Sequence, residues 1–416
     1  MRIGLVTACF EPVVNGVTRM VSLYRQHLEE AGHRVTIFTL GLVDQHDGER
    51  GIVRSPALPL GKTGYHLAVR YSRSAQKEMR QMDVLHCHHP LMGLEMAHRY
   101  GMCPVVFTNH TRYDIYLSAY SPLSIPASDK LMRQFWPPLT DFSDVVIAPS
   151  ESVRKLLLAV GVRKPVELIV NGIDLSAFHR YAAQKKIWQT DLPGQPTRII
   201  YVGRLSAEKN VLALLHEFAR AYRVNHQLHL TLVGDGQQRR QLERLASELG
   251  IRSRTTFTGE VDYSNVPVIL AKADIFATRS ISEVHPLTII EAMAIGLPIV
   301  ATSSPGIDDI VEDGVTGLLG PDREGELARC LTALSMDPKR ISRMGSSAFK
   351  TSSRYKIQNT VSRSLELYER LLAERPDLDR RSTRWQNRAR RLVHSWQCYL
   401  PVAPRSRSRR SGRYEQ

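Results

Sequence analysis

Residues 3–32 read IGLVTACFEPVVNGVTRMVSLYRQHLEEAG, and this stretch decides the fold. Its first eight residues form an apolar, partly β-branched run that is typical of a buried strand. After a polar turn, apolar residues recur at helical spacing, at Val17, Met20, Val21, Tyr24 and Leu28. Gly32 then provides a common helix stop. A strand, a turn and an amphipathic helix make the first βα unit of a parallel sheet, so the stretch predicts an α/β domain.

The same alternation continues along the chain. Further short apolar runs predict strands at 35–40, 84–87, 105–108, 145–148 and 166–170. A second series predicts strands at 199–202, 228–233, 255–257, 275–277, 299–301 and 317–319, with helices at 211–223, 237–249, 286–295 and 324–335. We therefore expect two doubly wound, Rossmann-like α/β domains over residues 1–175 and 197–357, joined by a polar connection within 176–196. Ligands of such sheets bind beyond the carboxyl ends of the strands, which predicts a site in a cleft between the domains.

Charge is distributed unevenly along the chain. The 416 residues carry a net charge of +15, and residues 380–416, with 11 arginines and one acidic residue, contribute +10 of it. By composition this basic tail suits nucleic acid, an anionic membrane or solvent alone, and Trp385 and Trp396 among its arginines favour a membrane surface. No apolar run approaches the roughly 20 residues of a membrane span. With no signal-peptide pattern at the start, we expect a cytoplasmic protein at the inner face of the membrane.

Two segments suit a diphosphate. Asn15 and Gly16 lie at the start of the first predicted helix, where free N–H groups and the helix dipole favour an anion and glycine allows it to approach. Arg204 and Lys209 follow a predicted buried strand, and two cations at that place can hold a diphosphate. Each feature also occurs as an ordinary turn or as solvated charges, so neither alone identifies a site.

A third segment, EVHPLTIIEAMA at 283–294, suits sugar hydroxyls. A helix that begins near Pro286 offers the N–H groups of its first turn to an anion and carries Glu291 inside. A carboxylate accepts two hydrogen bonds from the vicinal diol of a ribose or a hexose. Glu283 and Glu291 therefore suit a ligand with a sugar at each end and phosphate between, although this spacing is common by chance.

These residues together resemble a known family. Glu283 to Glu291 is similar to the E-x7-E pattern of the retaining GT-B glycosyltransferases of family 4. Other matching stretches stand in that family's order and spacing, at 171–174 (NGID), 203–209 (GRLSAEK) and 291–298 (EAMAIGLP). The resemblance covers roughly residues 1–374. The Asn15-Gly16 turn and TNHTRY at 108–113 are most similar to the branch that glycosylates diacylglycerol or related lipids.

The resemblance implies catalytic roles for four residues. Arg204 and Lys209 would neutralise the leaving diphosphate, Glu283 would face the hydroxyls of the transferred sugar, and His110 would lie beside that sugar. Donor-binding contacts are implied for Asn15, Gly16, Val261, His285, Leu287, Thr288 and Glu291: Gly16 on the diphosphate, Val261 near the base, Glu291 on the ribose diol and the N–H groups of the others near the sugar. Pro286 removes a donor that many relatives have, which we interpret as the mark of a branch.

The implied chemistry is substitution at the front face of the sugar. No carboxylate near His110 or Asn15 stands out as the nucleophile that a double displacement needs. The resemblance instead implies that the departing diphosphate, stabilised by cations, takes the proton of the acceptor hydroxyl. A D-x-D motif occurs at 377–379, next to the tail and away from the predicted cleft. We therefore expect neither an essential metal nor another cofactor.

The acceptor is expected on the first domain. The candidate contacts are Tyr113, Tyr116 and Tyr120 in the aromatic, turn-rich stretch 113–126, which is unsuited to a regular helix. The basic and apolar segment 62–80, with Tyr71 among its apolar residues, suits an anionic membrane. An ordinary loop and a solvated helix face explain these two stretches equally well.

The expected function is transfer of a hexose, with retention, from a nucleotide diphosphate sugar to a membrane lipid hydroxyl such as that of diacylglycerol. UDP-glucose, UDP-galactose and GDP-mannose are the candidate donors. A soluble glycan or polysaccharide intermediate is the main alternative acceptor. A UDP-sugar 2-epimerase-like enzyme and a nucleic-acid-binding protein are less favoured, the second because no binding module is recognisable, so no nucleic acid partner is expected. As in relatives, a helix at about 360–374 is expected to return to the first domain.

Overall fold

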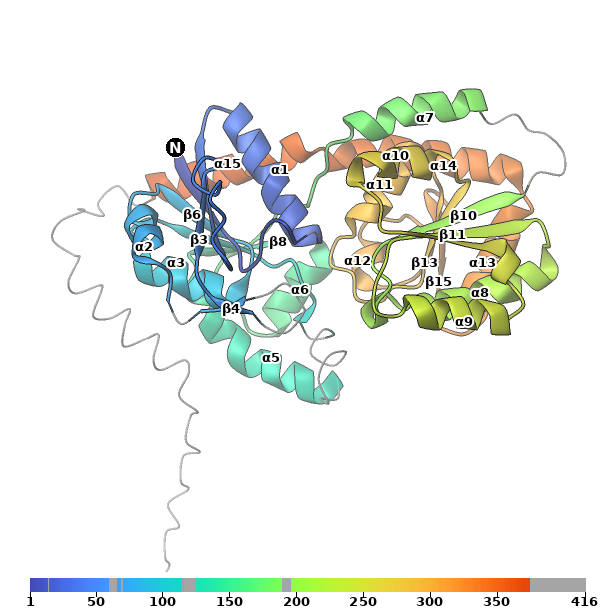
Figure 1. Ribbon diagram of the computed structural model, residues 1–416, viewed down its shortest axis with the longest axis horizontal. Helices are drawn as coiled ribbons and strands as arrows, with labels where there is room; N and C mark the ends of the chain where they lie inside the picture. Colours follow the sequence, from blue (N-terminus) through green and yellow to red (C-terminus); the bar gives the residue numbers. More distant parts are fainter. Residues whose placement is uncertain are drawn as a thin grey trace, which may run out of the picture. The chain divides into compact units, whose positions relative to one another are not determined.

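The computed structural model describes residues 1–13, 15–59, 66–68, 70–113, 115, 125–188 and 196–374, with the backbone alone at 125–129 and 185–188 (Figure 1). Tyr116, Tyr120, the D-x-D motif at 377–379 and the basic tail lie outside these residues. Two parallel sheets lie within one compact unit. None of the helices in the described part of the chain combines the length and the apolar character that crossing a membrane requires.

The first sheet has seven parallel strands in the order β3-β2-β1-β6-β7-β8-β9. The strands are β1 (Arg2–Val6), β2 (Arg34–Leu40), β3 (Ile52–Ser55), β6 (Val84–Cys87), β7 (Val105–Thr108), β8 (Val145–Ala148) and β9 (Val166–Leu168). The helices are α1 (Gly16–Glu30), α2 (Arg73–Met79), α3 (Glu95–Tyr100), α5 (Ile125–Thr140) and α6 (Glu151–Ala159), with an irregular turn η1 (Pro90–Leu94) before α3. A short antiparallel ladder, β4 (Leu58–Pro59) with β5 (His66–Leu67), lies outside this sheet. The strand order reverses between β1 and β6. In such a sheet ligands bind beyond the carboxyl ends of the two strands at this reversal.

The second sheet has six parallel strands in the order β12-β11-β10-β13-β14-β15. The strands are β10 (Thr197–Val202), β11 (Leu228–Val233), β12 (Thr255–Gly259), β13 (Ile275–Thr278), β14 (Ile299–Thr302) and β15 (Gly317–Gly320). The helices are α7 (Ser176–Trp188), α8 (Val211–Val224), α9 (Arg239–Glu248), α10 (Val266–Ala271), α11 (Leu287–Ile295), α12 (Pro305–Asp308), α13 (Glu326–Ser335) and α14 (Pro338–Ser352), with single 3-10 turns η2 (Ala207–Lys209), η3 (Arg252–Arg254), η4 (Tyr263–Asn265) and η5 (Ser353–Tyr355). Here the order reverses between β10 and β13, so the loops after these two strands meet at one place.

Helices cover both faces of the second sheet (Figure 1). One apolar core joins the sheet to α8, α9 and α13, and another joins it to α7, α10, α11 and α14. Burial on both faces explains why its strands are continuous apolar runs rather than alternating ones. The prediction of two doubly wound, Rossmann-like sheets is confirmed.

Two local predictions differ from the structure. The first strand ends at Val6 rather than continuing to Phe10, because the Thr7 hydroxyl turns to donate to the Cys9 carbonyl and the chain leaves the sheet. The polar connection at 176–196 is helical over Ser176–Trp188, because Phe178 is fully buried in the core with α10 and α11. A few apolar contacts therefore outweigh the polar composition of this segment.

The last helix, α15 (Ile357–Ala373), packs against α1 and the first sheet (Figure 1). Val361, Leu367 and Tyr368 lie in the same apolar core as β1 and α1. The Tyr24 and Ser364 hydroxyls are 2.9 Å apart, and the Tyr368 hydroxyl lies 2.6 Å from Nδ1 of His86. A helix from the end of the described chain thus completes the core of the first sheet.

Gly172, in the NGID stretch, allows the chain after β9 to approach the start of α15. The Ile173 N–H donates to the Tyr355 carbonyl at 2.9 Å, and the Ile357 N–H donates to the Ile173 carbonyl at 3.0 Å. A Cβ at Gly172 would lie 2.7 Å from both the backbone N and Cα of Ile357. These are backbone atoms, so a side chain at 172 requires a shift of the helix start.

We predict that Gly172→Ala lowers the free energy of unfolding by about 1–3 kcal/mol, the cost of overpacking a close contact. Denaturant unfolding followed by circular dichroism measures this difference. Gly48→Ala is the matched control: its added methyl group meets nothing within 4 Å. That control should change the free energy by about 0.5 kcal/mol or less. Equal unfolding midpoints for the two variants would contradict the prediction.

Candidate active site

Arg204 lies directly beyond the carboxyl end of β10 and is held by a buried carboxylate. Its Nη2 is 2.8 Å from Oε1 of Glu208, whose side chain is 2% exposed, whereas that of Arg204 is 52% exposed. The Ser206 hydroxyl donates to the same Glu208 oxygen, and the Tyr201 hydroxyl donates to the Arg204 carbonyl. The guanidinium is therefore oriented by fixed groups while it remains accessible from solvent.

Lys209 forms an ion pair with Glu283 across the point where the strand order reverses. Its Nζ lies 2.6 Å from Glu283 Oε1, and the two side chains are 24% and 15% exposed. Burial opposes ionisation of Glu283, but the charge and hydrogen bond of Lys209 outweigh it and hold the pKa of this carboxyl below its ordinary value. Glu283 is therefore an anion at neutral pH, able to accept hydrogen bonds but not to act as an acid.

Hydrogen bonds from side chains to backbone carbonyls also join the loops after β10 and β13. The Ser282 hydroxyl donates to the Glu208 carbonyl at 2.9 Å, and the Asn210 amide donates to the Arg279 carbonyl at 3.3 Å. Glycines permit the close approach of neighbouring segments: a Cβ at Gly236 would lie 2.4 Å from the Leu205 carbonyl oxygen. The glycine turn after β11 thus supports the loop that carries Arg204.

Helix α11 carries Glu291 into a buried position. It begins at Leu287, with Pro286 as its N-cap, so the backbones of Leu287 and Thr288 form its first turn. Glu291 is 2% exposed, and the Tyr263 hydroxyl donates to its Oε1 at 2.9 Å. Burial raises the pKa of Glu291, opposed by the charge of Arg19 and the Tyr263 hydrogen bond. The guanidinium of Arg19, on α1, stacks over the ring of Tyr263, which brings the first turns of α1 close to Glu291.

His285 precedes this helix, and its ring is directed into the protein. The side chain is 5% exposed and its ring meets Tyr355 at 5.4 Å between centroids. Burial lowers the pKa of His285 to about 4, so the imidazole is neutral at physiological pH. Only its backbone remains for the donor contact that the sequence predicted.

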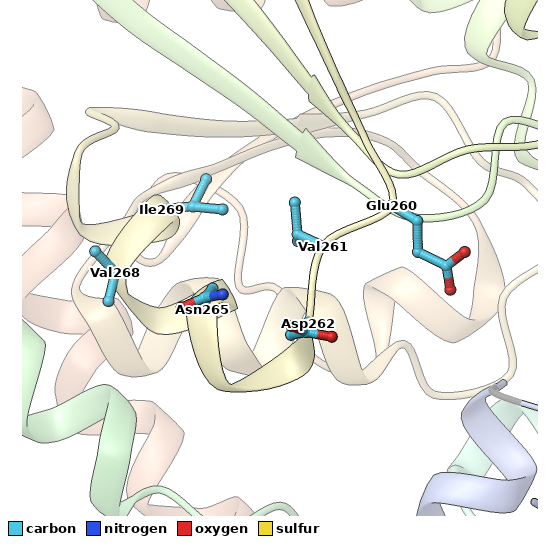
Figure 2. Close-up of a pocket in the computed structure, with 6 residues that line it drawn as sticks. All are labelled: Glu260, Val261, Asp262, Asn265, Val268 and Ile269. Carbon is cyan, nitrogen blue, oxygen red and sulfur yellow. The ribbon is translucent and has the colours of Figure 1, made fainter. Parts of the chain in front are cut away.

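Val261 lines a pocket of about 410 Å³ in the turn between β12 and α10 (Figure 2). The other lining residues are Glu260, Asp262, Asn265, Val268 and Ile269. The turn leads directly into Tyr263, the partner of Glu291. Val261, predicted near the base, therefore stands two positions before Tyr263, the hydrogen-bond partner of the carboxylate predicted for the ribose.

Asn15 and Gly16 differ in what holds them. Asn15 is the N-cap of α1: its Oδ1 accepts from the Val17 and Thr18 N–H groups at 2.9 and 3.0 Å. Its backbone N–H donates to the Thr18 hydroxyl, which completes a capping box. Gly16 is exposed, and a Cβ there would meet no atom within 4 Å. Packing thus explains Asn15 but gives no reason for a glycine at 16.

Histidines gather where β6 and β7 end. His110 follows β7, and its Nε2 lies 2.9 Å from Nδ1 of His88, which follows β6. Burial, together with the neighbouring rings of His89 and His86, lowers the pKa of His110 to about 3. His110 is therefore neutral at physiological pH and contributes no charge to the site.

The acceptor and membrane candidates are only partly described. Tyr113 packs on Trp136 of α5 with 4.8 Å between ring centroids, and it remains partly exposed. The stretch 113–126 was predicted to be unsuited to a helix, but α5 includes its last two residues. Tyr71, counted among the apolar residues of the candidate membrane segment, is 1% exposed and belongs to the protein interior. The prediction that Tyr71 contacts a membrane is therefore wrong. The side chains of Arg73, Lys77 and Arg80 on the same segment are exposed.

Four residues with a place in this site were not predicted from the sequence: Arg19, His88, Glu208 and Tyr263. Glu208 stands four positions after Arg204, a spacing at which opposite charges can pair. The other three reach their partners through the fold, since Tyr263 lies 28 positions from Glu291 and His88 22 positions from His110. No local pattern marks them.

Two Rossmann-like sheets, a pair of cations where the strand order of the second sheet reverses and two glutamates on either side of a helix start are typical of the GT-B class of glycosyltransferases. HepE of Anabaena, solved with UDP and glucose, has the same fold, with a TM-score of 0.69 and 20% identity over 89% of this chain and 99% of that one. The family model "Glycosyltransferase Family 4" matches residues 14–177, and "Glycosyl transferases group 1" matches residues 183–351.

Similarity to named enzymes identifies the family within this class. The chain is 32% identical over 340 residues to an alpha-monoglucosyldiacylglycerol synthase of Streptococcus pneumoniae, covering 77% of this chain and 75% of the relative. It is 25% identical over 366 residues to the enzyme of that name in Acholeplasma laidlawii, covering 84% and 92%. The chain belongs to the family 4, group 1 glycosyltransferases and is a hexosyltransferase, which confirms the resemblance found in its motifs.

The Lys209–Glu283 pair gives a prediction with a definite pH dependence. In the wild type the pKa of Glu283 is lower in the folded than in the unfolded state, so the pair stabilises the fold above the ordinary carboxyl pKa of 4.5. That contribution is lost as pH falls through the folded value. In Lys209→Met, burial acts on Glu283 without this cation and raises its pKa. The free energy of unfolding should fall by about 1–3 kcal/mol at about pH 8 and by less at about pH 5.

Denaturant unfolding at the two pH values measures the difference. The double variant Lys209→Met/Glu283→Gln removes both charges and should recover most of the loss at the higher pH, because no unpaired buried carboxylate remains. An equal loss for Lys209→Met at both pH values would show that the pair does not control ionisation of Glu283.

Proposed function

We propose that this enzyme transfers a hexose, with retention, from a nucleotide diphosphate sugar to the hydroxyl of a diacylglycerol-type membrane lipid. The observation that supports the donor side is the Lys209–Glu283 ion pair together with Arg204: two cations and one ionised carboxylate follow β10 and β13, between which the strand order reverses. The observation that favours the lipid acceptor is the similarity to two alpha-monoglucosyldiacylglycerol synthases. Their names also favour glucose as the transferred sugar.

Each donor group has a partner in this arrangement. The diphosphate lies between the Gly16 N–H and the side chains of Arg204 and Lys209. Glu291 accepts from the ribose diol, and Tyr263, which already donates to Glu291, fixes the direction of that carboxylate. The base enters the pocket lined by Val261. Glu283, ionised by Lys209, accepts from hydroxyls of the transferred sugar.

The reaction proceeds on one face of the sugar. The bond between the anomeric carbon and the diphosphate oxygen breaks, and the acceptor hydroxyl oxygen bonds to the same carbon from the same side. The proton of that hydroxyl passes to the departing phosphate oxygen. Arg204 and Lys209 stabilise the charge that develops on the diphosphate, so the enzyme's main contribution is electrostatic.

We further propose that the protein is cytoplasmic and rests on the inner face of the membrane. The exposed Arg73, Lys77 and Arg80 of the first domain and the basic composition of the tail support attraction to anionic lipid. The leucines at 58 and 67, on the β4–β5 ladder, are also exposed and suit contact with acyl chains. A soluble glycan remains the alternative acceptor.

We predict a glycolipid product when the purified protein is incubated with a donor and diacylglycerol liposomes. UDP-glucose, UDP-galactose and GDP-mannose are each tested with and without the lipid, and mass spectrometry detects nucleotide and lipid products. A retained anomeric configuration is measured by NMR of the product.

Glu291→Gln, which keeps the shape but not the charge of the ribose contact, should raise the donor KM about tenfold or more.

The outcomes separate the alternatives. Nucleotide release without a lipid product would replace the lipid by a glycan acceptor. Epimerised sugar nucleotide without transfer would favour the 2-epimerase-like reaction. Full activity of Glu291→Gln at wild-type KM would contradict the ribose assignment while leaving the reaction itself in place.

Gly16 allows a sharper test of the donor diphosphate site. Because no protein atom lies near its missing side chain, Gly16→Ala should leave the free energy of unfolding unchanged or raise it by up to about 1 kcal/mol. If a phosphate approaches this backbone, the methyl group should weaken UDP binding about tenfold or more, measured by calorimetry. Gly48→Ala, also open to solvent, is the control and should bind UDP normally. Unchanged UDP affinity in Gly16→Ala would remove Gly16 from the site.

A further inference from the structure

His88 is the direct neighbour of His110 and is held rigidly. The two residues follow adjacent strands, β6 and β7, and their rings are nearly parallel, at 14° and 5.2 Å between centroids. The His88 N–H donates to the Val6 carbonyl at 2.8 Å, and the side chain is 1% exposed. The edge of the Tyr24 ring and the ring of His86 pack on it at 5.5 and 4.3 Å. His88 therefore cannot turn without disturbing the core.

The hydrogen bond between the two rings has a direction that burial decides. Both imidazoles are neutral, because burial lowers the pKa of each. One nitrogen must then donate and the other accept. The second nitrogen of His88, Nε2, is buried and has no hydrogen-bond partner among the described residues. A proton there would be a buried donor without an acceptor, which is rarer in proteins and costlier than a vacant lone pair.

We propose that His88 is a positioning residue that sets the tautomer of His110. The proton of His88 lies on Nδ1 and is donated to Nε2 of His110, so His110 carries its own proton on Nδ1. Since Nε2 is bonded to His88, this Nδ1–H is the ring group with which His110, a partly exposed residue, can donate to a ligand.

The assignment limits what His110 can do in the proposed reaction, on which this inference rests. Its Nε2 is occupied by His88 and its Nδ1 is protonated, so neither nitrogen can accept the proton of the lipid hydroxyl. His110 instead donates a hydrogen bond to an oxygen of the transferred sugar or of the diphosphate. This agrees with a reaction in which the leaving group, rather than a side chain, acts as the base.

Two variants of nearly equal shape isolate the hydrogen bond. In His88→Asn the amide Nδ2 takes the place of the imidazole Nδ1 and can still donate to His110. His88→Leu has a similar volume and no donor. Both lose the aromatic packing of His88, and Asn also buries an amide oxygen, so a merely structural role would lower turnover at least as much in His88→Asn as in His88→Leu. Denaturant unfolding measures the stability of each variant.

Imidazole ¹⁵N NMR at neutral pH is the first measurement, with the His110 signals assigned by their loss in His110→Gln. We expect a proton on Nδ1 of His110 in the wild type and in His88→Asn, with the unprotonated Nε2 signal shifted by the hydrogen bond that it accepts, and the loss of that hydrogen-bond shift in His88→Leu. A proton on His110 Nε2 in the wild type would overturn the proposal without any variant. This readout does not depend on turnover, so it decides the inference even if no donor gives a lipid product.

The second measurement is turnover in the liposome assay. His88→Leu should lower kcat about tenfold with little change in the donor KM, and His88→Asn should stay within about threefold of the wild type. An equal loss in both variants would overturn the positioning role. So would full activity of His88→Leu, whereas full activity of His110→Gln would show that the proposed function misplaces His110 itself.

Discussion

The ion pair between Lys209 and Glu283 is the interaction on which the site depends. It joins the loop after β10 to the loop after β13, the two strands between which the order of the second sheet reverses. The same two loops are tied by hydrogen bonds from Ser282 and Asn210. A cation that is paired in this way keeps its position before any ligand arrives, so little reorganisation is needed when the diphosphate charge develops. Removing most of the Glu283 carboxylate from water costs free energy, and the Lys209 cation offsets that cost.

Close backbone packing fixes the positions of these loops. The Gly236 turn lies against Leu205, and Gly306 lies against Glu283, whose carbonyl oxygen would be 2.1 Å from an added Cβ. Contacts this close leave no room for the loops to slide. Gly16 is the opposite case, a glycine that nothing in the protein crowds. The contrast between glycines that pack against backbone and one that faces open space separates the scaffold from the surface available to a ligand.

Sequence reasoning found the sheet strands and the charged residues at their ends because both are local. Strands buried on two faces are continuous apolar runs, and residues directly after them must lie at one edge of a parallel sheet. The partners of the site residues could not be found in this way. Tyr263 reaches Glu291, and Arg19 reaches Tyr263, only because separate helices bring them together. The buried position of Tyr71 and the helical state of 176–188 were missed for the same reason, since tertiary packing outweighs local composition there.

Helix α15 has a consequence for the order in which the protein is made. Tyr368 and Ser364 are the partners of His86 and Tyr24, so the last core contacts of the first sheet form with residues that lie about 200 positions after its final strand. The second sheet draws on segments between those points and can assemble earlier. Proteins usually fold from the N-terminus as they leave the ribosome. Here the core of the first domain is complete only after the last helix has been synthesised. A nascent chain that stops before α15 would expose the apolar face of α1, a surface of the kind that chaperones bind.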